Sequence, residues 1–184
     1  MMKHTMIAEL SELGRMLHHS GMVRARAGNL SARLPDGTFI ITRAATHKGL
    51  LVASDFLLLA ADGTPLENGQ PSSETALHLA AYAVAEIGCV AHAHPLACTT
   101  LAHLNLALQV DLAEEGRLVL GEPPLLDDQP KDSRAAAWGK AVAVGTRAAL
   151  LRKHGLVVAG RDPQDVLCKM ELCEWLAELQ LRLR

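Results

Sequence analysis

The order of its apolar segments constrains the fold of this 184-residue chain more than any other feature. Several long stretches carry apolar residues every three or four positions, which is the periodicity of an amphipathic helix. The last of them follows Asp162-Pro163, a capping carboxylate with proline at the first helical position. We therefore predict helices at Thr5–His18, from Ser73 through Val84, at Pro95–Leu104, at Ser133–Val144 and from Pro163 to the C-terminus.

Short apolar runs of strand length alternate with these helices. They predict strands at Asn29–Leu34, Thr38–Thr42, Phe56–Ala60, Cys89–Ala93, Ala148–Arg152 and Leu156–Ala159. Pro35-Asp36-Gly37 joins the first two as a hairpin turn, and Glu67–Ser73, rich in Gly, Pro and Ser, is typical of a loop. No linker or repeat divides the sequence, so we expect one α/β domain over residues 1–184, with helices covering a central sheet.

Charge and composition exclude several kinds of partner. The net charge is −2 and no basic run interrupts the balance, so we expect no nucleic acid partner. The longest apolar stretches fall far short of the roughly 20 residues that a membrane helix needs, and the N-terminus lacks the apolar core of a secretion signal. Cys89, Cys98, Cys168 and Cys173 form no short-spaced pair. We therefore expect a cytoplasmic protein with reduced thiols and no membrane partner.

Three histidines form the candidate metal site. His92 and His94 flank Ala93 at the end of a predicted strand, where residues i and i+2 point to the same face. His154 follows a second apolar strand and precedes Gly155, which permits a close backbone approach. Three imidazoles plus one open position are the ligand set of a catalytic zinc, and Mn, Co or Fe can use the same nitrogen ligands. Each histidine alone also fits a structural role.

A candidate acid/base and a candidate anion site lie around the predicted second helix. Glu74 follows Ser72-Ser73 at a helix N-terminus, which favours anions. Gly28-Asn29 precedes a predicted strand and could supply further backbone donors. Each feature has a structural alternative, because a first-turn glutamate often only stabilises its helix and Gly-Asn often only forms a turn. His78, four residues after Glu74, is expected as a hydrogen-bonding neighbour rather than a fourth ligand.

Taken together, four motifs resemble those of the class II aldolase/adducin family. Gly28–Arg33 resembles the family's G-N-x-S-x-R signature, and Gly69–Thr75 resembles its G-x-P-S-S/A-E segment. Ala91–Pro95 resembles its H-x-H metal motif, and Lys153-His154-Gly155 resembles the motif that carries the third ligand. The four motifs occur in the family's order, and the resemblance covers nearly the whole chain.

The resemblance implies an α/β/α fold with a mostly antiparallel central sheet, assembled as a homo-oligomer, usually a C4 tetramer with sites at subunit interfaces. It implies one zinc ion per subunit, held by His92, His94 and His154. It also implies a general acid/base, Glu74, and a small sugar or sugar phosphate as substrate. The residues that would hold the anionic end of that substrate are Gly28, Asn29, Thr42, Arg43, Lys48, Ser72 and Ser73. The function that it favours is retro-aldol cleavage of a carbon–carbon bond in a ketose or ketose phosphate through a metal-stabilised enediolate.

One loop departs from the family pattern. The family's phosphate loop reads I-T-P/A-S/T-G, whereas this chain has Ile41-Thr42-Arg43-Ala44-Ala45 and so lacks a hydroxyl and a glycine. Arg43 or Lys48 could supply positive charge instead, and a carboxylate is as possible a substrate anchor as a phosphate. The tyrosines that the family's aldolases use also have no counterpart, because Tyr82 is the only tyrosine.

Two alternative functions remain open at this point. Thr46–Gly49 and the C-terminal helix resemble the methylthioribulose-1-phosphate dehydratases of the same family, in which a glutamate of the middle segment is the acid/base. Glu114 or Glu115 could take that role here, and a decarboxylase or epimerase would use a similar site. The adducin branch shows that a non-catalytic interaction protein is also possible, but the retained histidines together with Glu74 favour an enzyme.

Overall fold

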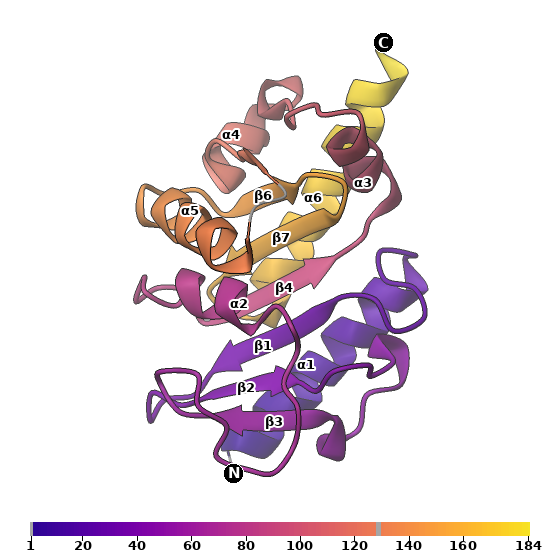
Figure 1. The fold of residues 1–184 in the computed structure, drawn as a ribbon. Helices are drawn as coiled ribbons and strands as arrows, with labels where there is room; N and C mark the ends of the chain where they lie inside the picture. The colour runs from indigo at the N-terminus through magenta and orange to yellow at the C-terminus, as the bar shows by residue number, and fades with distance from the viewer. Residues whose placement is uncertain (1, 128–129) are drawn as a thin grey trace.

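One seven-stranded sheet with six α-helices is present in the computed structural model, which describes residues 2–127 and 130–184 (Figure 1). The helices are α1 Met2–His19, α2 Thr75–Ala81, α3 Leu96–His103, α4 Glu114–Leu120, α5 Lys131–Ala143 and α6 Pro163–Arg182. The strands are β1 Asn29–Arg33, β2 Phe39–Thr42, β3 Phe56–Leu59, β4 Cys89–Ala93, β5 Leu125–Leu126, β6 Ala148–Leu151 and β7 Gly155–Gly160. Three short 3₁₀ helices cover Lys48–Leu50, Ala53–Asp55 and Val110–Leu112.

The strand order is β3-β2-β1-β4-β7-β6-β5, and every neighbouring pair is antiparallel except β5 and β6. This confirms the predicted α/β domain with a mostly antiparallel sheet. The Pro35–Gly37 hairpin turn is confirmed too, since the Leu34 N–H donates to the Thr38 carbonyl at 2.8 Å. In the register of β1 and β4, Asn29 lies opposite His92, so two predicted site residues from distant parts of the sequence become neighbours.

Helices cover both faces of the sheet and enclose two apolar cores (Figure 1). Alternate residues of each strand point to opposite faces. In β4, Cys89 and Ala91 face the layer that contains α1, α3 and α6, whereas Val90 faces the layer that contains α2 and α5. His92 has the same parity as Val90, and its side chain is therefore directed to the α2 and α5 side.

The predicted second helix is shorter than expected. It ends at Ala81 instead of continuing past Val84, and Ser73 does not cap it, because Glu74 is the capping position and makes no side-chain cap bond. The Arg33 guanidinium donates to the carbonyl oxygens of Tyr82 and Val84, which a longer helix would have used for its own backbone bonds. The helix therefore stops where a side chain from β1 takes its carbonyl groups.

Two elements are absent from the sequence-based prediction. The parallel strand β5 has only two residues, too few to produce a recognisable pattern. The helix α4 contains Gly116, a weak helix former, at a position where any Cβ atom would lie 2.1 Å from the Val110 carbonyl oxygen. Packing therefore requires glycine at this position. Because glycine is a weak helix former, residue propensities did not predict this helix. Within the described ranges, no helix is long and apolar enough to cross a membrane.

Trp138 anchors α5 on the sheet, and its replacement by alanine is expected to lower the free energy of unfolding by about 3–5 kcal/mol. The side chain is fully buried in the core beneath α2 and α5, so truncation leaves a cavity among packed neighbours. Urea denaturation followed by circular dichroism measures this effect. Trp175→Ala is the matched control, because Trp175 is 49% exposed, and its cost should be much smaller. Equal costs for the two variants would contradict the assignment of Trp138 to the core.

Candidate metal centre and active site

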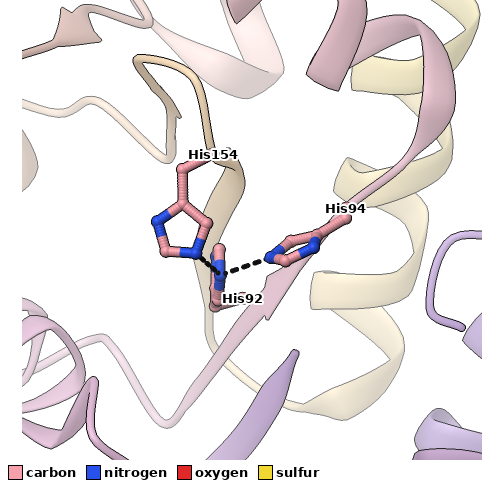
Figure 2. A group of neighbouring side chains, drawn as sticks. All are labelled: His92, His94 and His154. Atoms are coloured by element: carbon pink, nitrogen blue, oxygen red, sulfur yellow. Dashed lines mark hydrogen bonds between the residues drawn. The ribbon is translucent and has the colours of Figure 1, made fainter. Parts of the chain in front are cut away.

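His92, His94 and His154 meet at one end of the sheet (Figure 2). His92 lies in β4, His94 follows the end of β4, and His154 lies in the turn between β6 and β7. The Nε2 atom of His92 is 3.0 Å from Nε2 of His94 and 3.2 Å from Nε2 of His154. The three imidazoles therefore bring their ring nitrogens together, as expected from the spacing of His92 and His94 and from the family motif around His154.

The tautomer of the His92 ring is fixed by the hydrogen bond of its Nδ1 atom. Nδ1 lies 2.9 Å from the Leu156 carbonyl oxygen, which can only accept, so Nδ1 carries the proton and Nε2 presents a lone pair to the centre. Burial and the adjacent His154 and His94 hold the pKa of His92 well below its ordinary value. Burial and His154 also lower the pKa of His94, while the nearby Glu74 carboxylate opposes the shift. Neutral rings with inward lone pairs are the form that binds a metal.

The spacing of these nitrogens fits a tetrahedral metal ion. Ligand nitrogens about 2.0–2.1 Å from a tetrahedral zinc lie roughly 3.3 Å apart, close to the two distances measured from His92 Nε2. Gly155 permits the approach, since a Cβ atom on it would lie 2.5 Å from the Ala93 carbonyl oxygen and 2.7 Å from the His94 ring. The donor set is thus three imidazole nitrogens beside the adjoining cavity.

A cavity of about 230 Å³ opens beside the three histidines. Most of the predicted site residues line it. The lining residues are Arg26, Gly28, Asn29, Arg43, Ala44, Ala45, Lys48, Gln70, Ser72, Ser73, Glu74, His92, His94 and His154. The fold therefore brings together the predicted metal ligands, the predicted acid/base and six of the seven predicted anion-binding residues.

Thr42 is the predicted residue that does not line this cavity. Its side chain is fully buried in the sheet, and its hydroxyl oxygen accepts the Leu30 N–H at 3.1 Å. Arg43 lines the cavity, but its guanidinium already donates to the carbonyl oxygens of Ser54 and Asn68, at 2.9 and 2.8 Å.

Gly28 has a φ of +74°, and a Cβ atom there would lie 2.6 Å from the His92 carbonyl oxygen, so only glycine fits.

The divergent loop keeps a left-handed turn without its glycine. Ala45 has a φ of +60°, in the region that glycine occupies more readily than other residues. The preceding Ala44 N–H donates to the Gln70 carbonyl oxygen at 3.0 Å and ties the loop to the segment that contains Ser72 and Ser73. The loop therefore retains a turn at the cavity wall, although the sequence there lacks the expected hydroxyl and glycine.

Glu74 is held by two cations from α5 that the sequence analysis did not identify. Arg134 Nη2 lies 2.7 Å from Glu74 Oε2, and both side chains are buried. Lys131 Nζ lies 3.3 Å from the other carboxylate oxygen and donates to the Ser73 carbonyl oxygen at 2.9 Å. The sequence did contain an indication that Arg134 is buried and paired: it lies four positions before Trp138, on the apolar stripe of a helix.

Glu114 and Glu115, the alternative acid/base candidates, lie elsewhere. Both are exposed in the first turn of α4, and neither lines the cavity of this chain. Tyr82 is also outside the cavity, buried beneath α2 with its hydroxyl on Ser31. Among the described residues, Glu74 is thus the carboxylate that lines the cavity beside the three histidines.

Lys48 gives a pH-dependent prediction for anion binding at this cavity. Its buried ammonium donates to the Thr46 carbonyl oxygen at 2.6 Å, and burial lowers the pKa of Lys48 to about 8, with Asp55 opposing the shift. The positive charge is present below pH 8 and is lost as the pH rises through that value. The affinity for sulfate, whose charge is the same at pH 7 and 9, should therefore fall with pH when it is measured by calorimetry at these two values. Lys48→Arg should flatten this dependence, and an unchanged affinity in Lys48→Met at pH 7 would contradict it.

The chain is therefore an α/β protein with a mostly antiparallel, helix-covered sheet. It brings together three imidazoles, which could hold a metal ion, and a carboxylate beside a polar cavity. Comparison with known proteins identifies its family. A profile described as the class II aldolase and adducin N-terminal domain matches residues 8–181. The chain belongs to the class II aldolase/adducin family.

Relatives resemble the chain over nearly its whole length. The methylthioribulose-1-phosphate dehydratases of Acidiphilium cryptum and Methylococcus capsulatus are 35% and 33% identical to it, over 96% and 97% of this chain and 90% and 94% of theirs. YgbL from Escherichia coli superposes with a TM-score of 0.87 and 28% identity, covering 99% of this chain and 91% of its own. The L-fuculose-1-phosphate aldolase from Thermus thermophilus gives a TM-score of 0.81 and 28% identity, covering 96% and 93%.

Proposed function

We propose that this chain is a metal-dependent lyase that dehydrates a ketose phosphate, in the manner of the methylthioribulose-1-phosphate dehydratases. The observation that carries the proposal is the near full-length likeness to those enzymes at 30–35% identity, in a chain whose three histidines converge beside a cavity. The retro-aldol function favoured by the sequence motifs becomes the second candidate. The likeness to L-fuculose-1-phosphate aldolase at 28% identity keeps it in consideration.

His92, His94 and His154 would hold the metal ion, and we propose zinc, for which three imidazoles plus one open position are a known catalytic ligand set. A divalent ion bound there supplies Lewis-acid stabilisation of negative charge on a carbonyl oxygen next to the reacting carbon. The arrangement leaves the cavity side of the three nitrogens open to a substrate. The remaining chemistry, the movement of protons, falls to the protein's own side chains.

Glu74 is the group proposed to move those protons. In dehydration of a hydroxy ketone, a base takes a proton from the carbon next to the carbonyl group, and the β-hydroxyl then leaves as water. One carboxylate can serve both steps, because the proton that it gains in the first is the proton that it donates in the second. The Arg134 and Lys131 contacts support this role, since they hold the carboxylate in one orientation at the cavity wall.

The products distinguish dehydration from cleavage. We would incubate the zinc-loaded protein with methylthioribulose 1-phosphate and follow the mixture by ³¹P NMR and mass spectrometry. Dehydration gives one product that keeps both the phosphate and the methylthio group and has lost one water molecule. Retro-aldol cleavage gives two carbonyl fragments that divide these groups between them, and that result would overturn the dehydratase proposal in favour of the second candidate.

We also propose that the chain forms a homo-oligomer, a tetramer as its family resemblance implies. Leu96 and Leu104 at the ends of α3 expose 68% and 53% of their surface, and Leu118 on α4 exposes 88%. Large exposed apolar side chains are typical of protein interfaces. Light scattering should give a mass several times that of one 19.7 kDa chain, and a mass equal to one chain at micromolar concentration would refute the proposal.

A further inference from the structure

Four buried polar side chains form a continuous hydrogen-bonded series behind the cavity. The Tyr82 hydroxyl lies 2.7 Å from Ser31 Oγ, which lies 2.6 Å from His78 Nδ1. On the other side of the ring, His78 Nε2 lies 2.5 Å from Asn29 Oδ1. The series runs from α2 and the turn after it to β1, and it ends at a residue that lines the cavity. All four side chains are at least nine-tenths buried.

The direction of donation in this series follows from its first member. A phenol is a good donor and, when buried, must give its proton to some acceptor. Ser31 Oγ lies within hydrogen-bonding distance and can accept that proton, so we take Tyr82 to donate to Ser31. The single proton of Ser31 is then free to donate to His78 Nδ1. The ring must in turn carry its own proton on Nε2 and donate to Asn29 Oδ1.

The charge state of His78 agrees with this direction. Burial lowers the pKa of His78 to about 3, so the ring is neutral at physiological pH and carries a single N–H. A neutral ring must accept at one nitrogen and donate at the other. The series thus has one arrangement in which every hydroxyl and ring proton has an acceptor.

We infer that Tyr82, Ser31 and His78 are positioning residues that fix the amide of Asn29 with its N–H₂ group facing the cavity, as a donor to an anionic oxygen of the ligand. With Oδ1 held by His78, Nδ2 is the atom turned away from that bond. An amide free to rotate would present either a donor or an acceptor. The buried series holds Oδ1 away from the cavity, so Asn29 presents only a hydrogen-bond donor at this corner of the cavity.

The position of Asn29 allows its N–H₂ group to contact a ligand that is bound at the proposed metal centre. Asn29 lies opposite His92 in the register of β1 and β4, where paired residues are roughly 4.5–5.5 Å apart between Cα atoms. A ligand could therefore contact the metal centre and place an anionic group against Asn29 at the same time. The inference rests on the proposed function, which supplies the reaction that the ligand undergoes. The group that Asn29 would recognise is an anionic oxygen, which either a phosphate or a carboxylate can provide.

The protonation pattern can be measured without any reaction. ¹⁵N NMR of the zinc-loaded protein should show His78 with a protonated Nε2 and an unprotonated Nδ1 throughout pH 6 to 8. The signals are assigned by their loss in His78→Gln. A proton on Nδ1, or a doubly protonated ring, would overturn the inference. Because no substrate or turnover is involved, failure of the proposed function would leave this test intact.

Anion binding tests the consequence. Inorganic phosphate and acetate are titrated by calorimetry into zinc-loaded wild type and Ser31→Ala, with metal content and melting temperature checked for each protein. Loss of a hydrogen bond to a charged group weakens binding by about 10- to 100-fold, and we expect a loss in or near this range for Ser31→Ala. Ser11→Ala is the matched control, because its hydroxyl bonds only the Ile7 carbonyl oxygen of its own helix and should leave affinity unchanged.

A conservative variant separates positioning from simple packing. His78→Gln keeps an N–H donor in reach of Asn29 and should recover part of the affinity that His78→Leu loses. Tighter binding of phosphate than of acetate would assign the corner to a phosphate end, and the reverse would assign it to a carboxylate; both support the donor. Folded Ser31→Ala with wild-type affinity for both anions, or no binding of either anion to wild type, would overturn the inference.

Discussion

His92→Ala is expected to lose bound zinc, from about one ion per chain to nearly none, and to lose turnover with it. His92 is the central residue of the three proposed ligands, since its Nε2 lies within 3.2 Å of the corresponding atoms of both His94 and His154. Two remaining imidazoles cannot complete the three-nitrogen set that holds a catalytic zinc. Elemental analysis of identically purified proteins measures the occupancy, and an activity assay on the same samples measures the loss.

His103→Ala is the control for this substitution. His103 is exposed on α3 and bonds the Thr99 carbonyl oxygen, so its removal should change neither zinc content nor activity. Zinc should also raise the melting temperature of wild type but not of His92→Ala, because a metal that binds the folded state stabilises it. Full zinc occupancy in His92→Ala would place the metal elsewhere and contradict the assigned ligands.

Glu74→Gln should keep zinc but lower kcat by about 100- to 10,000-fold, the contribution expected of a positioned acid/base. Glutamine is nearly isosteric and can still accept from Arg134, but it cannot take up and return a proton. The assay is steady-state turnover with zinc content measured on the same protein. Retained zinc with lost turnover separates a proton-transfer role from a metal-binding role.

Glu114→Gln and Glu115→Gln form the comparison for this variant. Both glutamates are exposed on α4, away from the cavity of their own chain, so either substitution should leave kcat close to wild type. Near-normal activity in Glu74→Gln together with a large loss in Glu114→Gln or Glu115→Gln would transfer the acid/base role to α4. In that case α4 of a second subunit would have to complete the cavity.

His154 lies 62 residues from His92, so its place beside the other two histidines was expected from its resemblance to a family motif and not from spacing. The common face of His92 and His94, by contrast, could be predicted from sequence, because their i, i+2 spacing on a strand is local. The same holds for the Asp162-Pro163 start of α6, where the Asp162 side chain accepts the Asp165 N–H at 2.8 Å. These features depend on residues close together in the chain.

The surroundings of Glu74 and Asn29 could not be predicted in this way. Arg134 reaches Glu74 across 60 residues, and His78 reaches Asn29 across 49, so both contacts depend on how α2 and α5 pack over β1 and β4. The early end of α2 arises likewise from Arg33, a side chain on another element. Sequence periodicity describes one element at a time and carries no information on such pairings.

Activity as a function of added zinc tests the proposed metal-dependent dehydration most directly. Protein stripped of metal by a chelator is titrated with zinc, and dehydrated product from methylthioribulose 1-phosphate is measured at each addition. We expect no turnover without metal, a linear rise, and saturation at about one zinc per chain, with no rise in His92→Ala. Turnover that survives complete metal removal, or fails to appear at any zinc level, would contradict the proposal of a metal-dependent dehydrating lyase.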